Sequence, residues 1–137
     1  MGDDLLRLRT ARALRWRLAE TGTHEDGSRW ERYLWRDTAR AGYIDYRQDG
    51  SASPGGLLRL PQYGTTWASC EEVDAEIKER EWLAQIDMDG NTTRVFLFTS
   101  ANGLIGTRLS TATAPTFPAA FCEAFCLAVE ANDVNAQ

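Results

Sequence analysis

The 137-residue sequence has no long hydrophobic run, and this absence limits where the chain can reside. No segment approaches the roughly 18–20 consecutive apolar residues that a membrane helix requires. Residues 1–17 combine early aspartates with scattered arginines, so they lack the apolar stretch of a signal peptide. We therefore expect a cytoplasmic protein that does not associate with a membrane.

Cysteine and histidine are scarce. The three cysteines, Cys70, Cys122 and Cys126, cannot all pair, which argues against a disulfide framework. Cys122 and Cys126 are four residues apart and could supply half of a metal site, but the single histidine, His24, lies in a polar loop without a spacing relation to them. The sequence therefore predicts no metal and no cofactor, and it predicts that the cysteines are small, reduced core residues.

Lysine is almost absent, because arginine outnumbers it fourteen to one. This bias is typical of a GC-rich genome and is not a nucleic-acid signature. The net charge is −5, and it is unevenly distributed: residues 1–47 carry ten arginines against eight acidic residues, whereas residues 48–89 carry three basic residues against nine acidic ones. An excess of acidic residues makes non-specific DNA binding unfavourable, so we do not expect a nucleic-acid partner.

The first half of the chain predicts one helix followed by two strands. Leucines at positions 5, 8, 14 and 18 follow helical spacing, and Gly22 is expected to end this helix. Residues 29–37 and 42–50 are rich in tryptophan and tyrosine with partial alternation, which favours strands. Asp49–Gly56 is predicted to be a flexible loop. The aromatic residues are interpreted as sheet packing: Trp30, Tyr33, Trp35, Tyr43 and Tyr46.

The stretch Leu60–Val73, LPQYGTTWASCEEV, could be a ligand site or the start of a helix. Thr65 or Thr66 is a natural N-cap, because its hydroxyl can accept a hydrogen bond from an unpaired backbone N–H. A catalytic interpretation would need a base, and neither a histidine nor a cysteine pair supplies one. We therefore predict a helix start, followed by an apolar stripe at helical spacing: Trp67, Cys70, Val73 or Asp74, and Ile77.

Beyond Arg80 the pattern changes to a period of two. Residues 82–88, 93–100 and 104–114 read as strands joined by the turn sequences DGN and ANG, which predicts an antiparallel meander. Val95–Phe98 is apolar at four consecutive positions, which predicts a central strand covered on both faces by helices. A last helix is expected from about Thr116. The sequence as a whole predicts one α+β domain over residues 1–137, an α/β/α sandwich with a mainly antiparallel sheet.

Three segments resemble a known family, the phage ABA-sandwich domain proteins of tailed phages and prophages. They are Pro61–Trp67 at the start of the predicted helix, Ser110–Pro115, and Ala120–Ala124 in the last helix. The resemblance is best over residues 60–131. It implies a phage or prophage origin, residence in the cytoplasm of a bacterial host and an α/β/α sandwich. The family name describes an architecture, so the resemblance implies no activity and no catalytic residues.

A short, acidic, single-domain chain without catalytic motifs fits a protein-binding role. Our first hypothesis is a small phage accessory protein that binds a host or phage protein, for instance to inhibit a host defence system. Glu72, Glu76 and Glu79 share one face of the helix predicted to begin at Thr65 or Thr66, and they are the candidate partner-binding residues. Such a stripe could mimic the phosphates recognised by a DNA-binding partner.

Two alternatives stay open. The chain could be a virion-assembly or homo-oligomeric structural protein, if the aromatic residues of the 29–37 strand are exposed. It could also be a small hydrolytic enzyme, if His24 and Asp26 assembled with Asp87 and Asp89. The second alternative is weakened by the chemistry of Asp89-Gly90-Asn91, which is typical of a turn.

Overall fold

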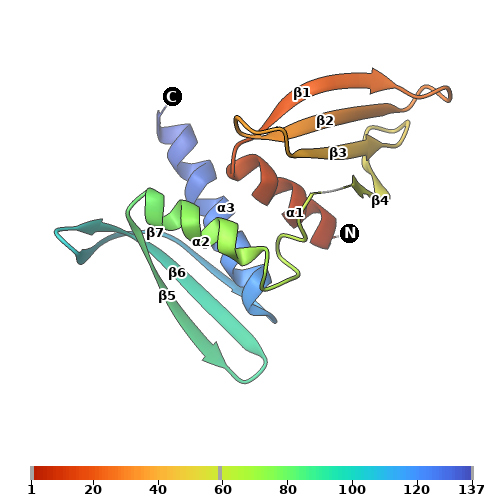
Figure 1. Cartoon of the computed structure of the whole chain (residues 1–137). Helices are drawn as coiled ribbons and strands as arrows, with labels where there is room; N and C mark the ends of the chain where they lie inside the picture. Colours follow the sequence, from red (N-terminus) through yellow and green to blue (C-terminus); the bar gives the residue numbers. More distant parts are fainter. Residues whose placement is uncertain (1, 59, 137) are drawn as a thin grey trace. The chain divides into compact units, whose positions relative to one another are not determined.

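The computed structural model describes residues 2–58 and 60–136, and the fold is α+β (Figure 1). The described residues form three helices and two antiparallel sheets. The chain divides into two compact units, Met1–Pro61 (unit 1) and Gln62–Gln137 (unit 2). No helix among the described residues is both long and apolar enough to cross a membrane.

Unit 1 is a helix on a four-stranded sheet. Its elements are α1 (Gly2–Ala13), β1 (Trp16–Thr23), β2 (Arg29–Trp35), β3 (Ala41–Tyr46) and β4 (Ala52–Leu58). The strands lie in chain order and each pair is antiparallel. In Figure 1, α1 lies against one face of this sheet. The two predicted strands are confirmed as β2 and β3.

The first helix is shorter than predicted, and the strand β1 was missed. The helix ends at Ala13, Arg15 takes a left-handed conformation with φ of 69°, and residues from Trp16 onward pair with β2. A spacing of four residues, as between Leu14 and Leu18, fits a strand as well as a helix. Gly22 does not end a helix; a Cβ there would lie 2.3 Å from the Trp30 indole, so glycine leaves room for that ring.

The prediction that Asp49–Gly56 is a loop is wrong from Ala52 onward. β4 begins at Ala52 and pairs with β3, with Ala52 opposite Tyr46. The turn itself is shorter: the backbone N–H of Arg47 donates to the carbonyl of Ser51 at 2.7 Å, and Gly50 adopts a φ of 92°. β4 is the last strand of the sheet, and an edge strand tolerates a proline such as Pro54.

The aromatic residues of unit 1 pack on both faces of its sheet, which confirms a packing role. Tyr33 and Tyr46 are buried, and both hydroxyls donate hydrogen bonds to the Glu31 carboxylate. Burial together with this bond raises the pKa of Tyr46 to about 12. Trp30 and Tyr43 are half-buried, because they alternate with these residues along β2 and β3. These four side chains therefore lie on opposite faces of the sheet.

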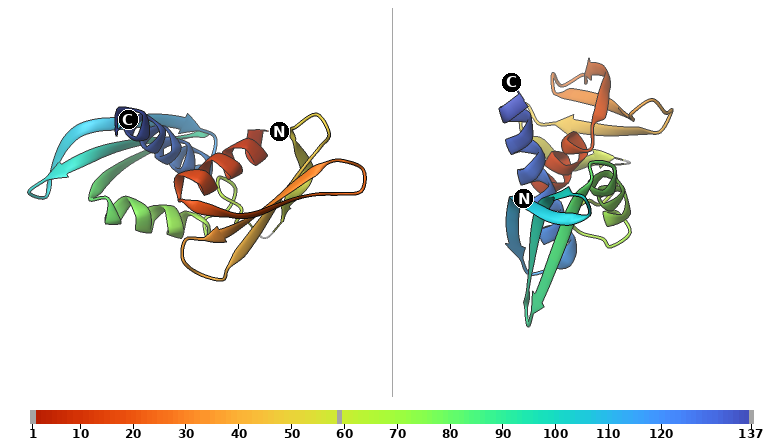
Figure 2. Two further views of the ribbon diagram at one scale, coloured as in Figure 1. Left: turned by 90° about the horizontal axis from the view of Figure 1, so that it is seen from above. Right: turned by 90° about the vertical axis from the view of Figure 1, so that its left-hand side faces the viewer.

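Unit 2 contains the predicted meander between two helices. Its elements are α2 (Cys70–Glu79), β5 (Trp82–Asp89), β6 (Thr92–Ala101), β7 (Leu104–Ala114) and α3 (Phe117–Ala136). The sheet order is β5-β6-β7, which confirms β6 as the central strand. Figure 2 shows that the tips of the β5–β6 and β6–β7 hairpins extend beyond the helices of this unit. α3 packs on β6 and β7, and the Ser110 hydroxyl donates to the Ala124 carbonyl at 2.7 Å.

Covering of the central strand by helices on both faces is not confirmed. Val95 and Leu97 are fully buried on the face where α2 and α3 pack. Phe96 and Phe98 point to the other face, where they are half-buried and stack on each other with ring centroids 6.4 Å apart. A sheet alternates its side chains between two faces, and two phenylalanines can shield one another where no helix covers them.

Candidate functional site: an aromatic groove in unit 2

The segment before α2 is a capped turn. α2 begins at Cys70, later than predicted, and its N-cap Ser69 makes no side-chain capping bond. The backbone N–H of Ser69 donates to the Thr66 hydroxyl at 3.3 Å, and the Ser69 hydroxyl donates to the carbonyls of Gln62 and Thr66. Thr65 is exposed. Thr66 alone therefore makes the capping bond, for the turn that leads into α2.

Replacing Thr66 with alanine should lower the free energy of unfolding by about 0.5–2 kcal/mol, the usual effect of losing a capping hydroxyl. The Thr65→Ala variant is the matched control and should be unchanged, because Thr65 is exposed. Chemical denaturation of both variants measures the difference. Equal destabilisation by the two substitutions would contradict the assignment of the cap to Thr66.

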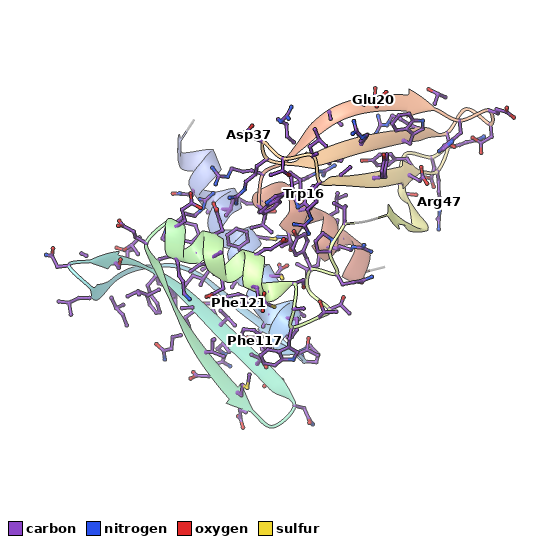
Figure 3. All side chains as sticks on the ribbon, viewed as in Figure 1. Trp16, Glu20, Asp37, Arg47, Phe117 and Phe121 are labelled. Carbon is purple, nitrogen blue, oxygen red and sulfur yellow. The ribbon has the colours of Figure 1, made fainter. Side chains whose placement is uncertain are left out.

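Trp67 was predicted to lie in the core, but its side chain is 63% exposed. The reason is the late helix start, which removes Trp67 from the apolar stripe of α2. The Trp67 indole stacks on Phe117 with ring centroids 4.5 Å apart, and Phe117 stacks in turn on Phe121 at 4.9 Å. Figure 3 labels the two phenylalanines at the start of α3. These three rings form a stacked row, which we call the aromatic row.

The aromatic row borders a groove of about 470 Å³ within unit 2. α2 forms one wall and the first part of β5 forms another, while the start of α3 contributes two rings. Its apolar lining includes Trp67, Ile77, Trp82, Ile86, Phe117 and Phe121. Sequence reasoning missed this groove, although the four-residue spacing of Phe117 and Phe121 signals a shared helix face.

The rim of the groove is charged and mainly acidic. Glu71 is exposed, and Asp74 forms an ion pair with Lys78 at 2.8 Å across one turn of α2. Unit 2 as a whole carries four basic residues against eleven acidic ones, a formal net charge of −7. An apolar floor within an acidic unit favours a ligand that combines apolar and basic groups.

The predicted acidic stripe is not a continuous exposed surface. Glu76 is only 1% exposed and accepts a hydrogen bond from the Arg80 guanidinium at 2.8 Å. Glu72 accepts a hydrogen bond from the buried Tyr63 hydroxyl. Glu79 is exposed. The face containing these residues borders the buried stripe of Val73 and Ile77, so its middle turns inward, and a buried carboxylate requires a partner such as Arg80.

The three cysteines are free and buried, as predicted. Cys70 lines the groove, and a hydrogen bond from the Cys122 thiol lowers the pKa of Cys70. The same bond, together with burial, raises the pKa of Cys122. Among the described residues, no three histidine, cysteine or acidic side chains are grouped so that they could hold a metal ion.

Cys70 should be the first cysteine to react in the native protein. It lies on the groove and has the lowered pKa, whereas Cys122 and Cys126 are fully buried in α3. Thiolate is the reactive form, so iodoacetamide at pH 8 should modify Cys70 well before the other two. Peptide mapping by mass spectrometry measures the three rates. Equal rates, or faster modification of Cys122, would contradict this order.

The residues considered for a hydrolytic enzyme belong to different units, and the side chains of His24 and Asp26 already have partners within unit 1. In unit 1, the His24 ring pairs with Asp45 at 3.0 Å. Asp26 accepts hydrogen bonds from the backbone and hydroxyl of Ser28, and these bonds lower its pKa. In unit 2, Asp87 and Asp89 lie at the end of β5. The contacts of Asp26 with Ser28 are those of a turn between β1 and β2, and the His24 ring contacts β3 of the same sheet.

The comparisons with known proteins add no relative: no protein-family model matches the chain, and no curated protein matches its sequence. The groove is therefore interpreted from its own geometry. Its lining is aromatic and aliphatic, its rim is acidic, and its most exposed large ring is Trp67. These properties are typical of a surface that binds a side chain or a segment of another protein.

Proposed function

We propose that this chain is a small phage- or prophage-encoded accessory protein that acts by binding a host or phage protein, without catalysing a reaction. The proposed binding site is the groove of unit 2. The phage origin, and the bacterial cytoplasm as the place of action, rest on the resemblance of residues 60–131 to the phage ABA-sandwich family. The partners included in the proposal are proteins of host defence systems.

The observation that supports binding at the groove is the exposure of the aromatic row. Trp67 is 63% exposed, and it is held in place by stacking on Phe117. A large ring fixed in this way can bury much apolar area on binding, with little further loss of conformational freedom. Tryptophan is accordingly enriched among the residues that contribute most of the binding free energy at protein interfaces.

The test is a pull-down from the bacterial host with mass spectrometry, followed by calorimetry with each purified candidate partner. Trp67→Ala should weaken binding about tenfold or more, because anchor residues of this kind contribute at least 1–2 kcal/mol. Leu5→Ala is the control, since Leu5 is 60% exposed and lies in unit 1, outside the groove. A partner bound equally by both variants and the wild type would place the binding site elsewhere.

Self-assembly is a second candidate function, supported by a different observation. Leu104 and Ile105, at the start of β7, are 71% and 61% exposed. Neighbouring exposed aliphatic residues on a projecting hairpin are typical of a contact between subunits. Size-exclusion chromatography with light scattering should show a stable oligomer that Leu104→Lys dissociates. A monomer at high micromolar concentration would remove this candidate.

A further inference from the structure

We infer that the partner segment binds in an extended conformation, as an additional β-strand on the free edge of β5, and that its side chains alternate between apolar and basic. This inference rests on the proposed function and specifies how the groove recognises its partner. The groove lies between α2 and β5, so a segment placed in it would lie alongside the backbone of β5. Strand addition to a sheet edge is a general mode of peptide recognition.

The first support is the regularity of β5 as an edge strand. Among the described residues it pairs only with β6, in eight consecutive register pairs from Trp82 opposite Thr99 to Asp89 opposite Thr92. The opposite edge of the sheet is different, because the β6–β7 pairing contains two irregularities. Edge strands are commonly protected by bulges, proline or lysine, and the β5 sequence WLAQIDMD contains neither proline nor lysine.

The second support is the shape of the groove beside that edge. Ala84 and Ile86 point toward the same face as the buried Val95 and Leu97, since they are their register partners. Ile77 of α2 and Phe117 of α3 line the same groove. In a strand added to β5, every second side chain would enter this apolar space, and the side chains between them would point away from it.

The third support is charge, which favours a basic partner over a second copy of this chain. Glu71 and Asp74 lie at the groove, where Lys78 pairs with Asp74, and Asp87 and Asp89 lie at the end of β5. Pairing β5 with β5 of another copy would bring two units of net charge −7 together, and like charges repel. Lysine or arginine side chains that point away from the groove would instead lie beside Asp87 and Asp89, which alternate with Ile86 along β5 and point to that same side.

The test uses a displayed library of random twelve-residue peptides, selected on the immobilised full-length protein. Selected peptides should alternate lysine or arginine with aliphatic or aromatic residues. The selected peptides are resynthesised with a fluorescent label. They should bind the Ile86→Lys protein about tenfold or more weakly than the wild type, because the substitution places a charge in the groove. The control is Leu5→Lys, which introduces the same charge at a 60% exposed site in unit 1, outside the groove, and should leave affinity unchanged.

Two further measurements report the backbone pairing itself. N-methylation of alternate peptide amides, on the edge that faces β5, should weaken binding about tenfold or more, because it removes ladder hydrogen bonds and leaves the side chains in place. Hydrogen exchange followed by NMR should show new protection of the β5 amides that do not pair with β6. The circular dichroism of the free and bound peptides should show no helix.

The possible failures can be told apart. Peptides that need Ile86 but bind as helices, or that leave the β5 amides unprotected, would overturn strand addition and leave the proposed function standing. Selection of acidic peptides, or of none sensitive to Ile86→Lys, would overturn the inference entirely. A dimer in light scattering with protected β5 amides would make a second copy the occupant and overturn it as well. The proposed function fails separately, if no host or phage partner depends on Trp67.

Discussion

Replacing Leu97 with alanine is expected to lower the free energy of unfolding by about 2–5 kcal/mol, the range found for large-to-small changes in a packed core. Leu97 is fully buried in the central strand β6, on the face where α2 and α3 pack. Truncation removes apolar area from the core and leaves a cavity that neighbouring elements fill only in part. Chemical denaturation of the full-length protein, followed by circular dichroism, measures the loss.

The neighbouring residue on the same strand provides the matched comparison. Phe98 points to the other face, where it is half-buried and stacks on Phe96. Phe98→Ala should cost about 1–2 kcal/mol, less than Leu97→Ala although the removed side chain is larger, because part of the ring already contacts water. If Phe98→Ala were as destabilising as Leu97→Ala, the second face of the sheet would be covered after all, as the sequence pattern predicted.

The meander of unit 2 could be predicted because its determinants are local. Each strand is a continuous run of eight or more residues, and each hairpin turn carries its own signal. Gly90 has a φ of 59°, and Asn102 and Gly103 have φ values of 55° and 79°, which are the conformations that such turn residues supply. Neither turn depends on a distant contact, so the pattern alone indicates its position.

β1 could not be predicted, because its determinants are not local. β1 is a strand because it pairs with β2, and a pattern within the segment itself does not show that pairing. The spacing of the nearby leucines fits a helix and a strand equally well. The chain changes direction at Arg15, a residue that carries no turn signal in the sequence. β4 was missed because serine, proline and glycine are typical of loops, and only its pairing with β3 makes it a strand.

The candidate site was only partly accessible to sequence reasoning. The stretch around Thr66 was recognised as a capped start, but the exact helix boundary decides whether Trp67 is a core or a surface residue, and boundaries are the least predictable feature. Helical spacing showed that Glu72, Glu76 and Glu79 share a face. It could not show that this face turns partly inward, because that depends on the packing of α2 and on the pairing of Glu76 with Arg80.

Replacing Phe125 with alanine should lower the free energy of unfolding by about 3–5 kcal/mol, as expected for a buried phenylalanine. Phe125 is fully buried in α3, directly before the buried Cys126 and three residues after the buried Cys122. Phe117, at the start of that helix, is half-buried and belongs to the aromatic row. Substitution of Phe125 should therefore affect mainly stability, and substitution of Phe117 mainly binding, although both residues lie in α3.

Phe117→Ala should cost only about 1 kcal/mol of stability, because a partly exposed ring contributes less to the core. It should nevertheless weaken partner or peptide binding about tenfold or more, since Trp67 loses the ring on which it stacks. Thermal unfolding and calorimetric titration of both variants give the two quantities. A Phe117→Ala protein that binds like the wild type would show that the aromatic row is a structural feature and that the groove is not the binding site.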